Sequence, residues 1–207
     1  MGARSIRSVS RLPVAELRAH LAQEAARVMI ESGIEDFGLA KRKAADRLGV
    51  RSAGALPSNA QIQECLAERQ RIFEPTAHEG RLADLRRAAA QIMAELAPFR
   101  PRLVGAVLAG TPTINSPIEL HVFADAPEAV RAALEQRGAA VRDTQRRFRF
   151  GGQKTAHVPG FAFAHGSEVV EVMAFSENGA REAPLSPVDQ RPMRRANRQE
   201  VLELLRA

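Results

Sequence analysis

The sequence predicts an α+β fold, in which an N-terminal helical region is followed by a mixed β-sheet with helices. Before residue 100, apolar residues recur three and four positions apart, as on one face of a helix. After Pro101, apolar and polar residues alternate in short runs, as in strands. The change of period near residue 100 therefore marks the predicted boundary. The expected parts are a disordered tail over 1–12, a helical domain over 13–100 and an α+β domain over 101–207.

Four helices are expected in the first half, and residues with known capping preferences mark their ends. A proline, an Asp or a Ser/Gln capping box stands at a start, and glycine or proline stands at a stop. The expected helices run from Pro13 to Gly33, from Asp36 to Gly49, from the capping box Ser58–Gln61 to Phe73, and from Glu79 to Leu96.

The second half is expected to contain five strands and two helices. Gly166 lies in a favourable hairpin turn before the last strand. Asn197 and Glu200 form a capping box at the start of the last helix. The expected strands are 103–108, 118–123, 141–150, 158–164 and 169–175, and the expected helices run over 125–138 and from 197 onward.

One segment of the second half, Leu103–Phe123, carries most of the chemistry. An apolar run reaches a glycine-rich bend, continues through a polar stretch and enters a second apolar run. In that run Glu119 and His121 alternate with Ile118, Leu120 and Val122. Because successive side chains of a strand point in opposite directions, Glu119 and His121 are expected on one face.

This layout resembles the nucleotidyltransferase superfamily, the fold of DNA polymerase beta. That family carries a Gly-Ser pair, then an Asp-x-Asp pair on the next strand, and a third acid on a later strand. Here Gly105 and Gly110 match glycines of the motif, Ser116 matches the serine that often precedes the acids, and Glu119 matches the second acid. Ala106 stands at the position of the motif's serine, and Pro117 at that of its first Asp.

The resemblance implies a nucleoside triphosphate as substrate and Mg²⁺ as cofactor, with acids as metal ligands and a glycine loop around the phosphates. It places Glu171, on the last predicted strand, at the third acid. Pro117 supplies no side-chain oxygen, so the metal site is expected to be incomplete. The implied catalytic residues are Glu119 and Glu171, the metal ligands Glu119, His121 and Glu171, and the phosphate-binding residues Gly105, Gly110 and Thr111.

Each of these residues also has a purely structural interpretation. Glu171 suits a salt bridge to an arginine on the sheet, because an acid among apolar neighbours needs a partner. His121 suits a hydrogen-bonded strand residue, and the two glycines suit an ordinary turn. The residues alone leave these alternatives open.

The charge pattern adds nucleic acid as a possible partner. Net charge is +6 and the isoelectric point is about 10.8, a balance that favours phosphate-bearing partners. Arg146-Arg-Phe-Arg-Phe150 suits either a stacking surface for nucleic acid or an amphipathic strand. Lys41, Arg42, Lys43 and Arg47 suit either DNA binding or the solvated face of a helix.

The predicted function is therefore a nucleotidyltransferase-fold protein with an eroded metal site, which transfers a nucleoside monophosphate from a triphosphate if it is active. The alternatives are a non-catalytic module that binds nucleotide, RNA or protein, and a DNA-binding regulator that uses the N-terminal helices. A cytoplasmic protein is expected, because no apolar run approaches membrane-helix length and Cys65 is the single cysteine. The resemblance extends to bacterial nucleotidyltransferase-like proteins and so implies a bacterial source. Activity, acceptor and oligomeric state are left open.

Overall fold

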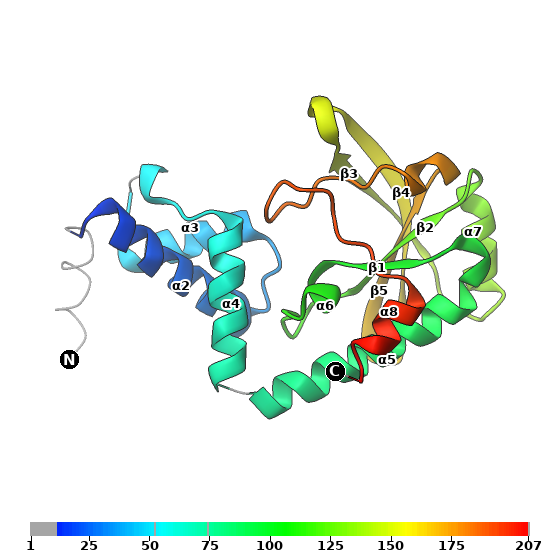
Figure 1. Ribbon diagram of the computed structural model, residues 1–207, viewed down its shortest axis with the longest axis horizontal. Helices are drawn as coiled ribbons and strands as arrows, with labels where there is room; N and C mark the ends of the chain where they lie inside the picture. The colour runs from blue at the N-terminus through cyan, green and yellow to red at the C-terminus, as the bar shows by residue number, and fades with distance from the viewer. Residues whose placement is uncertain (1–11, 52, 74, 207) are drawn as a thin grey trace. The chain divides into compact units, whose positions relative to one another are not determined.

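The protein has the expected α+β fold, seen in a computed structural model that describes residues 12–51, 53–73 and 75–206 (Figure 1). Within these described residues, four α-helices precede the sheet and five strands form it. The predicted tail lies outside the described residues except for Leu12. No described helix is long and apolar enough to cross a membrane.

The first three N-terminal helices begin and end where their capping residues predict, whereas the fourth begins at Pro75, four residues before the expected start at Glu79. Asp36 accepts a hydrogen bond from the Leu39 backbone N–H, and Gly33 and Gly49 take the left-handed conformation at two C-caps. Ser58 and Gln61 form the expected reciprocal capping box. The helices are α2 (Val14–Ser32), α3 (Phe37–Leu48), α4 (Asn59–Phe73) and α5 (Pro75–Glu95).

The five strands form one mixed sheet in the order β1-β2-β5-β4-β3. β2 and β5 run parallel, and every other neighbouring pair is antiparallel. The strands are β1 (Arg102–Val104), β2 (Ile118–Phe123), β3 (Arg142–Arg149), β4 (Thr155–His165) and β5 (Glu168–Phe175). The remaining helices are α6 (Gly105–Ala109), α7 (Pro127–Glu135) and α8 (Arg198–Glu203), with short 3₁₀ turns at Ala53–Ala55, Ala97–Phe99, Gly151–Gln153 and Glu177–Ala180.

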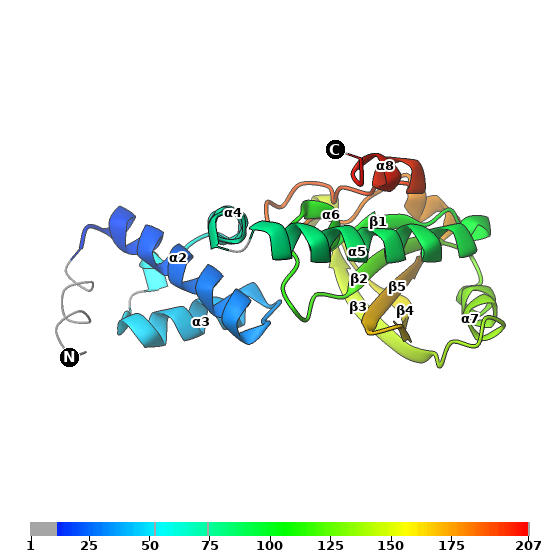
Figure 2. The ribbon, with the colours of Figure 1, turned by 90° about the horizontal axis from the view of Figure 1, so that it is seen from below.

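The two faces of the sheet have different roles. One face is apolar and packs against α5, α6, α7 and α8, and α5 lies along it (Figure 2). That core includes Ile92 of α5, Leu120 of β2 and Val172 of β5. The opposite face carries the predicted acids beside a smaller cluster of buried aromatic and aliphatic residues. That cluster, called the aromatic cluster below, consists of Phe123, Phe148, Phe150, Val158, Met173 and Phe175.

The chain divides into two compact units at a different place from the predicted boundary. The described residues up to His78, together with Thr113–Asn115, form the first unit, and the rest form the second. Helix α5 belongs almost entirely to the sheet's unit because its buried face, including Leu85 and Ile92, joins the core of the sheet. The change of hydrophobic period near residue 100 marks the end of that helix and not the division between the units.

The predicted strand 103–108 is wrong from Gly105 onward. β1 ends at Val104, and the next five residues form the short helix α6. Gly105 has a φ of +71°, which an extended strand does not adopt and which side-chain-bearing residues avoid. Val107 and Leu108 are buried against the core from this helix, so their apolar character reflects burial and not strand pairing.

Candidate functional site

The two predicted catalytic acids lie directly opposite each other. Glu119 of β2 pairs with Glu171 of β5 in the parallel register. Directly paired residues of neighbouring strands project to the same face of a sheet, so both carboxylates lie on the face away from the main core. Their side chains keep 20% and 26% of their accessible surface. The parallel register therefore creates a semi-exposed acid pair from residues far apart in the sequence.

A single arginine holds both acids. One terminal nitrogen of Arg146 lies 2.5 Å from an oxygen of Glu119, and the other lies 2.5 Å from an oxygen of Glu171. Burial opposes the charge of Arg146, but the charge and hydrogen bond of Glu119 and the charge of Glu171 prevail, so the pKa of the guanidinium is raised. Glu171 thus forms the expected salt bridge to an arginine, and its role as a catalytic and metal-binding acid stays a prediction.

Glu168, the neighbouring acid on β5, belongs to a different environment. It projects to the opposite face, where it forms a salt bridge to Arg81 of α5 at 3.1 Å. The hydrogen bond from Arg81 is the main reason why the pKa of Glu168 is lowered. Glu168 therefore does not belong to the acid pair.

Gly105 makes room for Glu119. A β-carbon placed on Gly105 would lie 1.8 Å from a carboxylate oxygen of Glu119, far inside van der Waals contact. Two separate features therefore favour glycine at this position: its positive φ, and the close approach of the Glu119 carboxylate. Gly110 ends α6 in the left-handed conformation, and the buried Thr111 donates its backbone N–H to the carbonyl of Ala106.

His121 lies on the same face but in a closed environment. Its side chain is 1% exposed, and its ring contacts the rings of Phe148 and Phe175 of the aromatic cluster. Its Nδ1 accepts a hydrogen bond from Nε of Arg195 at 3.1 Å. Burial, and then the nearby charges of Arg195 and Arg146, lower the pKa of His121 well below its usual value. The ring is therefore neutral at pH 7, and its role as a metal ligand stays a prediction.

Arg195 is a partly buried cation held by non-acidic groups. Besides His121 it donates to the backbone carbonyl of Gly179 at 2.9 Å, and its guanidinium lies near the rings of Phe123 and Phe175. Burial, together with the charge of Arg102, lowers its pKa to about 10. Besides Arg146, the face that carries the acid pair thus has a second cationic side chain, Arg195, beside the aromatic cluster.

The acid pair fits a divalent cation only in part. Among the described residues, no group of three or more His, Cys, Asp or Glu side chains is placed to hold a metal ion. Magnesium commonly takes one or two protein carboxylates and completes its shell with phosphate oxygens and water. Glu119 and Glu171, which already share one cationic group, suit that mode of binding, whereas Pro117 contributes no ligand.

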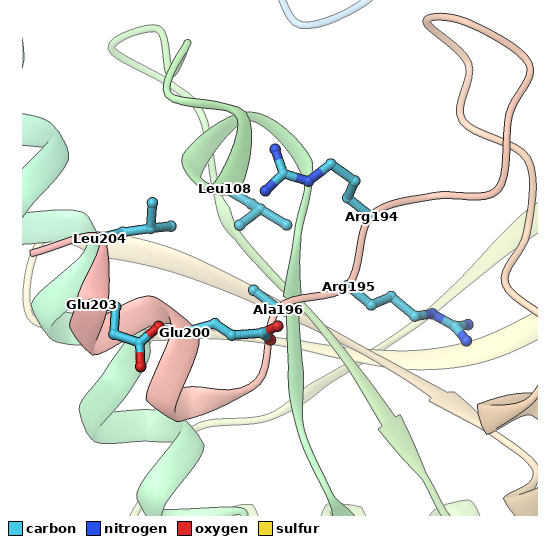
Figure 3. A pocket seen from close by; sticks show the side chains of 7 residues that line it. All are labelled: Leu108, Arg194, Arg195, Ala196, Glu200, Glu203 and Leu204. Carbon is cyan, nitrogen blue, oxygen red and sulfur yellow. The ribbon is translucent and has the colours of Figure 1, made fainter. Parts of the chain in front are cut away.

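A cavity lies elsewhere in the sheet's unit. Its volume is about 410 Å³, and it is bounded by α6, α8 and the segment that leads into α8. Figure 3 shows the guanidinium of Arg195 directed away from Leu108 and Leu204. Glu119 and Glu171 do not line this cavity, but Arg195 does.

The two predicted basic surfaces take different forms in the structure. In β3, Phe148 and Phe150 are buried and Arg147 and Arg149 are exposed, so the segment is an amphipathic strand and its aromatic rings are not available for stacking. On α3, Arg47 is paired with Glu24 and Glu31, which neutralises part of the basic face.

Sequence reasoning missed Arg146 and Arg195 as members of this surface. The alternation in β3 placed Arg146 on the same side as the phenylalanines, which was a usable signal for its inward face. Arg195 lies in a loop, where no periodicity predicts direction. Searches against protein-family models, curated proteins and solved structures found no match to this chain.

Proposed function

We propose that this chain is a nucleotidyltransferase-fold protein that binds a nucleoside triphosphate at the Glu119–Glu171 pair, with little or no transfer of nucleoside monophosphate. The observation that supports this proposal is the direct pairing of the two acids on one face of the sheet. The order of strand, glycine turn, strand and later acidic strand also supports it.

The proposed chemistry assigns a separate task to each group. Glu119 and Glu171 supply carboxylate oxygens to Mg²⁺, which when bound would neutralise charge on the phosphates. Arg146 offers a planar fork that matches phosphate oxygens. Pro117 leaves the acid set one member short, so binding is expected to exceed turnover.

A titration of the full chain with a fluorescent nucleoside triphosphate, with and without Mg²⁺, tests this proposal. Glu119→Gln and Glu171→Gln should each weaken the Mg²⁺-dependent affinity by about 10-fold or more, since each removes one of two ligands. Glu168→Gln is the matched control, because it removes an acid from the same strand but from the opposite face. No Mg²⁺-dependent binding, or equal losses in all three variants, would contradict the proposal. Release of pyrophosphate, followed in the same samples, measures turnover.

A second candidate is a non-catalytic module that binds nucleotide or RNA without metal. The observation that favours it is the Arg146 guanidinium between the two acids, where it already supplies a positive charge. In the titration above, binding that is unchanged by Mg²⁺ and by Glu119→Gln would favour this module.

A further inference from the structure

We propose that Arg146 acts as an internal cation, which keeps the acid pair closed to divalent metal ions until a phosphate-bearing ligand draws the guanidinium away. The closure itself follows from the contacts of Arg146. The identification of the phosphate-bearing ligand as a nucleoside triphosphate rests on the proposed function.

Arg146 contacts two acids that lie on strands not adjacent to its own strand, β3. β3 is an edge strand, and β4 and β5 lie between it and β2. Arg146 is paired with Val158, whereas Glu171 is paired with Ala162, so the arginine reaches the acids diagonally across the sheet. Its side chain keeps 43% of its accessible surface. A long, partly exposed side chain on an edge strand can leave this position without a change in the backbone.

The charges make the guanidinium and a metal ion competitors. Two carboxylates and one guanidinium leave a net charge of −1 on the cluster, and both ends of the guanidinium are engaged by carboxylate oxygens. A divalent ion between the same carboxylates would lie close to a like charge, which is unfavourable. It would also have to break two charge-assisted hydrogen bonds. Metal binding to the free protein is therefore opposed as long as Arg146 stays.

A phosphate group offers Arg146 an equivalent partner. Guanidinium binds phosphate in the same bidentate manner as carboxylate, so a phosphate-bearing ligand can accept the guanidinium and release the acids together. Metal and ligand then favour each other's binding, and thermodynamic linkage requires this coupling to be reciprocal. The acid pair should bind metal weakly alone and more tightly when Arg146 is engaged elsewhere.

Calorimetric titration of the full chain with Mn²⁺ alone tests the closure directly. Arg146→Gln should raise the affinity for Mn²⁺ by about 10-fold or more, within the usual range for coupled sites. Adding Glu119→Gln to that variant should abolish the gain. Arg142→Gln is the matched control, because Arg142 is an exposed arginine on the same face of the same strand and should leave the affinity unchanged. Arg146→Met serves as a second variant of similar length, and thermal unfolding verifies that each variant is folded.

The outcomes separate this inference from the proposed function. Equal Mn²⁺ affinities in the wild type and in both folded Arg146 variants would overturn the closure, even if the wild type binds triphosphate. An equal gain in Arg142→Gln would also overturn it, because the effect would then reflect net charge alone. A gain specific to the Arg146 variants supports the closure, even if the triphosphate titration shows no binding and the proposed function fails.

Discussion

At the scale of single residues, the Glu119 carboxylate occupies the space that a β-carbon on Gly105 would need. Gly105→Ala should lower the free energy of unfolding by more than Gly138→Ala. Both glycines have positive φ angles, +71° and +78°, so both substitutions carry a backbone penalty of about 1–2 kcal/mol. At Gly138 an added β-carbon meets nothing within 4 Å, whereas at Gly105 it meets the Glu119 carboxylate. Urea denaturation of the two variants measures the difference.

The comparison of the two glycine variants also reports on the site. If the two losses are equal, Glu119 moves aside freely and is not held at this position by its surroundings. A larger loss in Gly105→Ala shows that the acid is fixed. The triphosphate affinity of Gly105→Ala should then fall as well, since its acid has been displaced.

At the scale of elements, β3 is stabilised through one of its two faces. Phe148→Ala should lower the free energy of unfolding by about 3–5 kcal/mol, the usual loss for a buried phenylalanine. Arg147→Ala, at the neighbouring exposed position, should change it by less than about 0.5 kcal/mol. Chemical denaturation measures both. A Phe148→Ala variant that keeps its stability but loses affinity for single-stranded RNA would instead support the stacking interpretation.

The predictability of the elements from the sequence depended on how local their signals were. The helix ends at Asp36, Ser58 and Asn197 could be predicted because each cap is made by a residue within three positions of its partner. The strand expected over 103–108 could not be corrected in advance, because a short buried helix and a short buried strand are both apolar. The glycine at its centre was the one local sign of a break.

The site was predictable in its acids and not in its arginine. Alternation along β2 and β5 put Glu119 and Glu171 on definite faces, but the strand order that makes them neighbours is a property of the whole sheet. Arg146 reaches them only because of the register between β3 and β4. The contact also requires β5 and β2 to follow β4 in the sheet, and no local pattern in β3 encodes this strand order.

At the scale of the whole molecule, His121 links stability to pH. Its pKa is lowered in the folded protein by burial and then by the charges of Arg195 and Arg146. Below about pH 6.5 this histidine is therefore protonated in the unfolded chain and stays neutral in the folded protein until the pH falls further. The free energy of unfolding should therefore fall as the pH drops from 7 to 5, by up to about 2 kcal/mol from this residue.

Denaturation of the wild type and His121→Asn at several pH values tests this expectation. The variant keeps a hydrogen-bond acceptor for Arg195 but loses the titrating ring, so its stability should depend less on pH over this range. Parallel curves for the two proteins would show that other groups cause the acid sensitivity. Above pH 7 the two proteins should differ by a constant amount.

The position of β5 has a consequence for how the sheet is assembled during synthesis. β1 with β2, and β3 with β4, are antiparallel pairs of neighbouring strands, and β5 joins the two pairs in the centre of the sheet. A chain that stops before residue 168 would contain two separate two-stranded ribbons, which are marginally stable in water. β5 is also the last of the five strands in the chain, so both the complete sheet and the acid pair come into existence only when this final strand is inserted.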